Sequence, residues 1–262
     1  MEYEVFVCDS FTERKYSGNP AAVVPVNEWP HEQLMQNIAT ENNLSETAFI
    51  KPIGDNHYEI RWFSPLCEVD FCGHATLASA YVLFNHFDAG EIIRFETLHV
   101  GQLVVDRDLT GRIFMTFPLL KPIEIAAPSD LAEGLSIQPV EVLRNQQAYF
   151  AIYNNEQDVI DLKTNNEHLK KLAPYDVVAT AVGEEYDFVS RYFWPANGGD
   201  EDPVTGSIHA GLAPFWAERL EKSNLKAYQA SKRGGVLYCH VEPERVVVSG
   251  YAVLYSHGKI YA

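Results

Sequence analysis

Hydrophobic and polar residues alternate in several short stretches of the chain. EYEVFV at 2–7 and HYEIRWF at 57–63 both alternate with a period of two, so both are predicted strands. Between them, Pro30 precedes HEQLMQNIATENNL, where apolar residues recur at the spacing of a helix. A second helix is predicted over Ala75 to Phe87. This segment is apolar on nearly every face, so other structure should surround it.

The second half of the chain repeats the order of the first. QAYFAIY, DVVATAV and YDFVSRYF have the pattern of strands, and IHAGLAPFWAERL has that of a helix. RWFSP at 61–65 matches RYFWP at 191–195, and GHATLASA, which starts at 73, matches GSIHAGLA, which starts at 206. Because the matches occur in the same order about half a chain apart, they predict an internal duplication.

The duplication predicts two domains of similar fold, each with strands followed by one apolar helix. The expected boundary lies near FPLLKP at 117–122, where prolines follow a strand, which gives halves of 1–118 and 119–262. The C-terminal strand is expected to be free to cross back to the first domain.

The composition and charge of the chain argue against several classes of binding partner. The 262 residues carry a formal net charge of −16, and this negative field opposes binding to nucleic acid or to an anionic membrane. No run approaches the ~20 apolar residues of a transmembrane helix. The start, MEYEVFVCDSF, lacks the basic and apolar segments of a signal peptide, and the four cysteines form no C-x-x-C pair. A cytoplasmic protein with reduced thiols is therefore expected.

Glycines precede both apolar helices, and this favours an anion site. The first turn of a helix exposes backbone N–H groups and about half a positive charge, and glycine lets a ligand approach them closely. Two such entrances could hold a small carboxylate even in a strongly acidic protein. The positions expected to bind substrate are Gly73, Ala75, Thr205 and Gly206.

Side chains that can move protons lie near these entrances. The candidate catalytic residues are Glu46, His74, Asp202 and Ser207. Asp202 belongs to the acidic stretch GDEDPVTGS, in which Asp200 and Glu201 are expected to be solvated. Asp202 and Ser207 could also serve only to begin a helix or a turn.

The other candidates have structural alternatives as well. His74 could be a hydrogen-bonded core residue, and Glu46, between a predicted helix and a strand, could be a surface or capping residue. Cys72 could be an acid/base thiol or a small core residue. No phosphate-binding glycine loop, dinucleotide fingerprint or metal-spaced His/Cys cluster occurs, so neither a cofactor nor a metal is expected.

Taken together, these motifs resemble the phenazine-biosynthesis PhzF-like isomerase family, whose fold is similar to that of diaminopimelate epimerase. The matching segments run from near one end of the chain to near the other: SGNPAAVV, NLSETAF, SPLCEVDFCGHATLASA, GDEDPVTGSIHAGLAPFWAERL and SKRGGVLYCHV. The pair CGHATLA and EDPVTGS, half a chain apart, is the specific part of the resemblance.

The resemblance implies an α/β (α+β) fold of two pseudo-symmetric domains, each a mixed sheet rolled around a central helix, with the active site in the cleft between them. It also implies a cofactor-free enzyme that is usually a homodimer. In the family the glutamate of SETAF, here Glu46, is the central acid/base. The matching histidine, aspartate and serine are His74, Asp202 and Ser207.

The predicted function is isomerisation of a small cyclic or unsaturated carboxylic acid, in which Glu46 removes a proton and returns it elsewhere on the conjugated system. Related folds that racemise amino acids use two cysteines, whereas the entrances here carry His74 and Ser207. An amino-acid or hydroxy-acid epimerase that uses Glu46 and Asp202 remains an alternative. A catalytically idle small-molecule binder is another.

Overall fold

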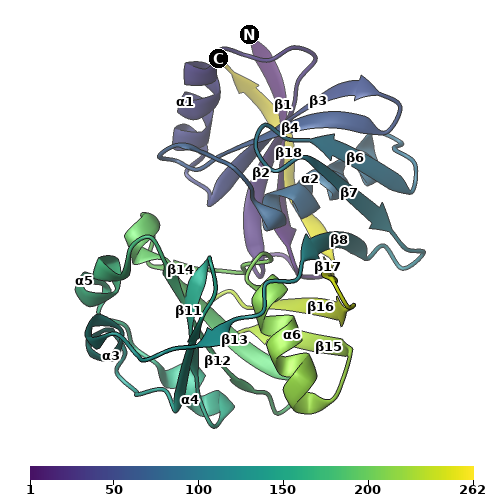
Figure 1. Cartoon of the computed structure of the whole chain (residues 1–262). Helices are drawn as coiled ribbons and strands as arrows, with labels where there is room; N and C mark the ends of the chain where they lie inside the picture. The colour runs from purple at the N-terminus through teal and green to yellow at the C-terminus, as the bar shows by residue number, and fades with distance from the viewer. The chain divides into compact units, whose positions relative to one another are not determined.

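The chain divides into two units in the computed structural model, which describes residues 1–262 (Figure 1). Unit 1 combines Met1–Thr116 with Ser249–Ala262, and unit 2 is Phe117–Val248. The chain therefore leaves unit 1, completes unit 2 and returns for its last strand. No helix of the structure has both the length and the apolar character needed to cross a membrane.

Unit 1 is a curved mixed sheet around one helix. Its strands pair in the order β18-β1-β2-β3-β4-β6-β7-β8, and β5 adds to β4. The helix α2 is buried on all sides and contacts β1, β2, β3 and β18, as its uniformly apolar sequence predicts. The elements are β1 (Glu2–Ser10), β2 (Asn19–Pro25), α1 (Glu32–Asn42), β3 (Glu46–Gly54), β4 (His57–Phe63), β5 (Glu68–Val69), α2 (Gly73–His86), β6 (Ile92–Glu96), β7 (Gln102–Arg107), β8 (Ile113–Pro118) and β18 (Ala252–Tyr261).

Unit 2 has its own mixed sheet and its own apolar helix. The strands pair in the order β9-β10-β11-β12-β13-β15-β16, with β14 added to β13, and α6 contacts β15 and β16. The elements are β9 (Ile123–Glu124), α3 (Ser129–Gly134), β10 (Glu141–Arg144), β11 (Ala148–Ile152), α4 (Glu156–Asp161), α5 (Asn166–Leu169), η1 (Lys170–Leu172), β12 (Asp176–Val182), β13 (Phe188–Phe193), η2 (Pro195–Asn197), β14 (Glu201–Asp202), α6 (His209–Leu220), β15 (Asn224–Gln229) and β16 (Gly235–Val241). One more strand, β17 (Arg245–Gly250), spans the point where the chain returns to unit 1.

The same topology occurs in both units. The pairs β2–β3 and β11–β12 are parallel, β3–β4 and β12–β13 are antiparallel, and a two-residue strand follows each. The register also agrees, since Trp62 faces Val69 in unit 1 and Tyr192 faces Asp202 in unit 2. The predicted fold class, two similar mixed sheets each with a central helix, is confirmed.

The two central helices begin differently, and their starts differ from the predicted ones by two residues in α2 and by one residue in α6. Cys72 has an extended backbone, so α2 begins at Gly73 rather than Ala75. In unit 2 the segment from Gly206 forms a tight turn, in which His209 N–H donates to the Gly206 carbonyl at 3.2 Å. The helix proper therefore starts at His209.

Pro214 lies inside α6 without breaking it, because another backbone group replaces the hydrogen bond that proline cannot donate. Pro214 has no N–H for the Ala210 carbonyl. The backbone N–H of Leu120 donates to that carbonyl instead, at 2.9 Å.

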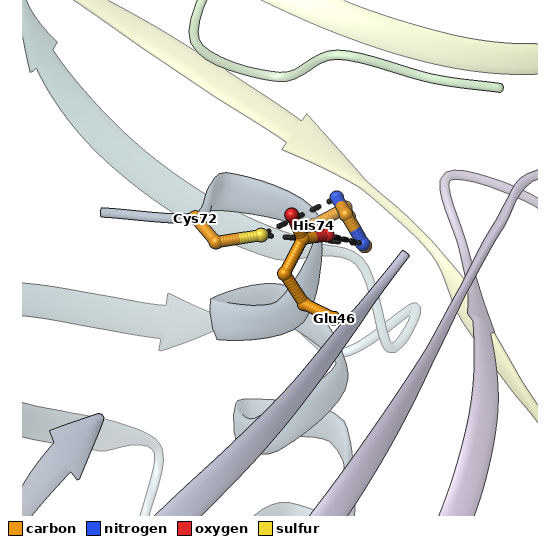
Figure 2. A group of neighbouring side chains, drawn as sticks. All are labelled: Glu46, Cys72 and His74. Carbon is orange, nitrogen blue, oxygen red and sulfur yellow. Dashed lines mark hydrogen bonds and ion pairs between the residues drawn. The ribbon is translucent and has the colours of Figure 1, made fainter. Parts of the chain in front are cut away.

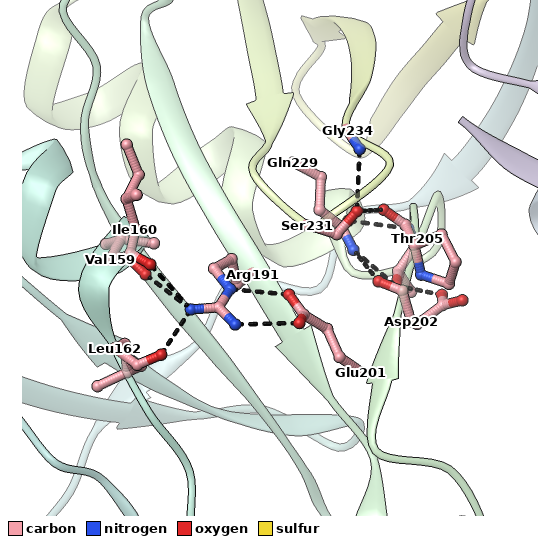
Figure 3. Close-up of polar contacts among 11 residues, drawn as sticks. Val159, Ile160, Leu162, Arg191, Glu201, Asp202, Thr205, Gln229, Ser231 and Gly234 are labelled. Carbon is pink, nitrogen blue, oxygen red and sulfur yellow. Dashed lines mark hydrogen bonds and ion pairs between the residues drawn. The ribbon is translucent and has the colours of Figure 1, made fainter. Parts of the chain in front are cut away.

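An arginine anchors the short strand in each unit. In unit 2, Arg191 of β13 forms a bidentate salt bridge with the Glu201 carboxylate, at 2.8 and 3.0 Å (Figure 3). The same guanidinium also donates to the main-chain carbonyls of residues 159, 160 and 162. Arg61 and Glu68 form the corresponding pair in unit 1, at 2.6 Å. Glu201 is therefore mostly buried and paired, and the expectation that it is solvated is wrong.

We expect Arg191→Met to lower the free energy of unfolding by about 3 kcal/mol, because it leaves the Glu201 carboxylate and three carbonyls without their donor. Urea denaturation followed by circular dichroism measures the change. The matched control is Arg245→Met, which removes a more exposed arginine from its contact with Glu242 and should cost no more than about 0.5 kcal/mol. Equal losses in the two variants would show that the Arg191 contact adds no stability.

Candidate active site

Glu46 begins β3, directly after the turn that ends α1. Asn43 ends that helix in the left-handed conformation, with φ 48°, and the chain then enters β3 parallel to β2. The side chain of Glu46 is only 13% exposed. A carboxylate in such a position needs a charged or hydrogen-bonding partner.

His74 is that partner. It is the second residue of α2, its side chain is 6% exposed, and its Nε2 lies 3.0 Å from Glu46 Oε2 (Figure 2). The other ring nitrogen, Nδ1, lies 3.1 Å from Asn19 Nδ2, and Ser45 Oγ donates to Asn19 Oδ1 at 3.0 Å. Asn19 and Ser45 thus hold the imidazole ring in place. Neither residue was predicted as a site residue, although the motifs SGNP and NLSE contain them.

Cys72 lies beside the same imidazole. Its Sγ is 3.4 Å from His74 Nδ1 and 4.0 Å from Nε2. Burial and the nearby Glu46 carboxylate raise the pKa of the Cys72 thiol to about 11, so the thiol is neutral at neutral pH. The structure therefore gives Cys72 the character of a buried neutral neighbour rather than of a nucleophile.

Two neighbours, Cys72 and Glu46, favour the protonated form of His74. Burial disfavours the imidazolium, but attraction from the Cys72 sulfur and from Glu46 exceeds that effect and raises the pKa of His74 well above 6.5. The site thus brings the Glu46 carboxyl group and the His74 imidazole within contact distance.

His74 should change its titration when Glu46 is neutralised. In wild type the NMR titration midpoint of His74 is expected above 6.5, and in Glu46→Gln it is expected to be lower than in wild type, because one of the two neighbours that raise the pKa is neutralised. Since the folded-state pKa is the higher one, the pair's contribution to stability is present below about pH 6.5 and is lost as the pH rises through the folded-state value. His209, whose pKa burial lowers to about 4, should be unaffected. An unchanged His74 midpoint would contradict the pairing.

Metal-ligand chemistry is also possible at this cluster. One ligand atom from each of Glu46, Cys72 and His74 lies within 4.8 Å of the others, and Asp130, Glu133 and His168 form a second such group in unit 2. Spacing along the sequence does not predict the first group, because Glu46 comes from β3 and His74 from α2. A carboxylate, a thiol and an imidazole are the ligand types that zinc binds in proteins.

In unit 2, Asp202 belongs to a tightly bonded loop. Thr205 Oγ1 donates to Asp202 Oδ2, and the buried Gln229 links both residues (Figure 3). Gln229 Oε1 accepts from the Thr205 N–H at 2.8 Å, and its Nε2 donates to the Asp202 carbonyl at 2.8 Å. Ser231 Oγ donates to the Pro203 carbonyl at 2.7 Å, which ties the loop to the turn after β15. The Asp202 carboxylate is thus held in place.

Ser207 lies in the turn that leads into α6. Gln147 Nε2 donates to Ser207 Oγ at 2.9 Å. Nearby, His209 Nδ1 lies 2.9 Å from the Thr205 carbonyl, so His209 supports the loop rather than the chemistry.

The predicted residues thus form two groups, one in each unit. Unit 1 brings together Glu46, Gly73, His74 and Ala75, and unit 2 brings together Asp202, Thr205, Gly206 and Ser207. In α2 the first helical bond runs from Thr76 N–H to the Cys72 carbonyl at 3.1 Å, so the N–H groups of its first three residues lie outside the helical ladder. The Ala75 N–H is directed toward the Cys72 sulfur.

Comparisons with known proteins agree with these motifs. The sequence model of the family described as phenazine biosynthesis-like protein matches residues 8–258. An uncharacterized isomerase of Pseudomonas aeruginosa is 45% identical over 263 residues, covering 100% of both chains. A crystal structure of a PhzF-family phenazine biosynthesis protein from Enterococcus faecalis is 40% identical, with a TM-score of 0.95 and 100% coverage of both chains.

A more distant structure shares the fold alone. A hydroxyproline epimerase from Agrobacterium vitis is 10% identical, with a TM-score of 0.63, and the match covers 99% of this chain and 92% of that chain. The close relatives bear the name isomerase, and the family match spans nearly the whole sequence. The chain therefore belongs to the phenazine biosynthesis-like family and, like these relatives, is an isomerase.

Proposed function

We propose that the protein moves a proton, and with it a double bond, on a small cyclic or unsaturated carboxylic acid. The observation that supports this most directly is the buried contact between Glu46 Oε2 and His74 Nε2, at 3.0 Å. A carboxylate placed beside an imidazole can accept a proton from an activated carbon, and in D₂O the carboxyl group can exchange that proton for a deuteron before it returns one to the substrate.

The proposed reaction conserves all atoms. The Glu46 carboxylate takes a proton from a carbon next to an alkene or a carbonyl, and the electron pair of that C–H bond enters the conjugated system. The Glu46 carboxyl then returns the proton to a different carbon of the same system, which gives an isomer. His74, held by Asn19, keeps its Nε2 close to the Glu46 carboxyl group while the proton moves.

The remaining candidates would bind the substrate. N–H groups at the start of α2, including that of Gly73, and the Ser207 hydroxyl suit a carboxylate. The Asp202 carboxylate suits an amino or hydroxyl group. We propose that the groups in both units act on one substrate molecule, and that the protein works as a homodimer without a cofactor.

An epimerase is the second candidate. It is favoured by the fold shared with a hydroxyproline epimerase and by the presence of a second carboxylate, Asp202, that could oppose Glu46. It predicts inversion at one carbon rather than migration of a double bond.

Solvent deuterium incorporation tests the proposal. The protein is incubated in D₂O with a metabolite extract supplemented with a dihydro-hydroxyanthranilate, and mass spectrometry searches for compounds that gain one deuteron. A gain with a shifted double bond supports the isomerase, and a gain with inversion at one carbon supports the epimerase. No gain in any compound, although ligands raise the melting temperature, would indicate a binder.

A further inference from the structure

A carboxylate in unit 2 occupies the position that Glu46 has in unit 1. Glu46 begins β3 and lies opposite Ala21 in the parallel pair with β2. Asp176 begins β12 and lies opposite Ala148 in the parallel pair with β11. The two acidic residues are therefore equivalent in the repeated topology, although their sequence surroundings, SET and YDV, differ.

Asp176 is the end of a chain of hydrogen bonds that reaches Ser207. Tyr192 OH donates to Asp176 Oδ2 at 2.5 Å, and Asn197 Nδ2 donates to Asp176 Oδ1 at 2.7 Å. Gln147 Nε2 donates to Tyr192 OH at 3.0 Å and to Ser207 Oγ at 2.9 Å. The chain lies entirely within unit 2, and Tyr192 is 4% exposed.

The direction of each hydrogen bond follows from the chemistry of the groups. The Tyr192 hydroxyl has one proton, which it donates to Asp176, so its oxygen must accept from Gln147. That requirement places the amide nitrogen, not the amide oxygen, of Gln147 toward Tyr192. The same nitrogen donates its second proton to Ser207. Ser207 Oγ is thus an acceptor within the protein, and its own proton remains available to donate to a ligand.

The pKa shifts of Asp176 and Tyr192 agree with a hydrogen bond that Tyr192 donates and Asp176 accepts. Burial raises the pKa of Asp176, whereas the hydrogen bonds from Tyr192 and Asn197 lower it. Burial and the adjacent Asp176 raise the pKa of Tyr192 well above 10, so Tyr192 keeps the proton that it donates. Asp176 accepts hydrogen bonds from two side chains, whereas Glu46 contacts an imidazole.

We propose that Gln147, Tyr192 and Asp176 are positioning residues that hold the Ser207 hydroxyl as a hydrogen-bond donor toward a ligand carboxylate. The identity of that ligand group rests on the proposed function. The orientation of Ser207 does not, because it follows from contacts within unit 2.

A cysteine placed at position 207 tests, in the absence of any ligand, whether Gln147 donates a hydrogen bond to this side chain. In Ser207→Cys, a hydrogen bond from Gln147 to the sulfur favours the thiolate, which lowers the thiol pKa and speeds alkylation. The alkylation rate of the peptide that contains position 207 is measured with iodoacetamide from pH 6 to 10. Peptide-level mass spectrometry separates this signal from the exposed Cys67.

Either of two additional substitutions should weaken the hydrogen bond from Gln147 to the side chain at position 207. Adding Gln147→Leu or Tyr192→Phe to Ser207→Cys is expected to raise the alkylation midpoint by about one pH unit, which slows alkylation near neutral pH about tenfold. Tyr192→Phe acts by removing the group that holds the Gln147 amide. The control is Tyr153→Phe, which removes another buried tyrosine hydroxyl of unit 2, one that donates to the Ile137 carbonyl at 2.9 Å. It should leave the midpoint unchanged.

The outcomes separate this inference from the proposed function. Equal midpoints in all variants, or the same shift in Tyr153→Phe, would overturn the positioning role, and circular dichroism identifies any variant that fails to fold. If wild type incorporates deuterium, Tyr192→Phe should raise KM about tenfold and change kcat less than twofold. If wild type incorporates none, the proposed function fails, and the thiol titration still decides the role of Gln147.

Discussion

Glu46→Gln is expected to reduce the rate of deuterium incorporation by at least about 10³-fold. The substitution keeps the size of the side chain but removes the carboxylate, which is the group proposed to accept a proton from carbon. Positioned general bases contribute about 10²- to 10⁴-fold to rate. The loss should lie toward the upper end, because the proposed mechanism uses Glu46 twice, first as base and then as acid.

The control for this variant is Glu41→Gln. Glu41 is an exposed carboxylate near the end of α1, only five residues before Glu46 in the chain, and its loss should leave the rate unchanged. Initial rates of deuteron gain, measured at saturating substrate by mass spectrometry, compare the variants with wild type. Equal rates in Glu46→Gln and wild type would remove Glu46 from the chemistry and direct attention to Asp202 or Cys72.

Asp202→Asn is expected to lower kcat/KM by about 10²-fold. Asparagine can still accept the hydrogen bond from Thr205, so the loop should keep its shape, but the negative charge that would hold an amino or hydroxyl group is lost. Charge-assisted hydrogen bonds are worth about 1.5–3 kcal/mol, which corresponds to a factor of roughly 10 to 150.

The neighbouring Asp200→Asn is the matched control. Asp200 is exposed, accepts a hydrogen bond from Asn166 at 2.6 Å, and lies two residues before Asp202. It removes the same charge from almost the same place, so it measures the general effect of lowering the negative field. If both variants lose activity equally, Asp202 acts through the overall charge and not through contact with the substrate.

The sequence was sufficient for the fold and for the proximity of Glu46 and His74. Alternation and apolar runs located the strands and the two buried helices, because those patterns reflect burial directly. The resemblance placed Glu46 and His74 at one site, and the structure brings their side chains into contact. The helix starts were less accurate, because α6 is preceded by a tight turn that has no distinct local pattern.

The supporting residues could not be identified in the same way. Gln147, Tyr192 and Asp176 come from separate segments, and only the pairing of β11, β12 and β13 places them together. Glu201 was expected to be solvated because it lies in an acidic stretch. Its partner, Arg191, lies on the adjacent strand. Hydrogen bonds across strands depend on register, which a local pattern does not record.

The position of the last strand has a consequence for synthesis on the ribosome. β1 pairs along its length with β18, and the backbone N–H of Ala262 donates to the Met1 carbonyl at 2.8 Å. Until residues 252–261 emerge, β1 can pair only with β2. Unit 2, by contrast, is continuous from Phe117 to Val248. We therefore expect unit 2 to complete its fold during synthesis before β1 pairs with β18, whereas N-terminal domains usually fold first.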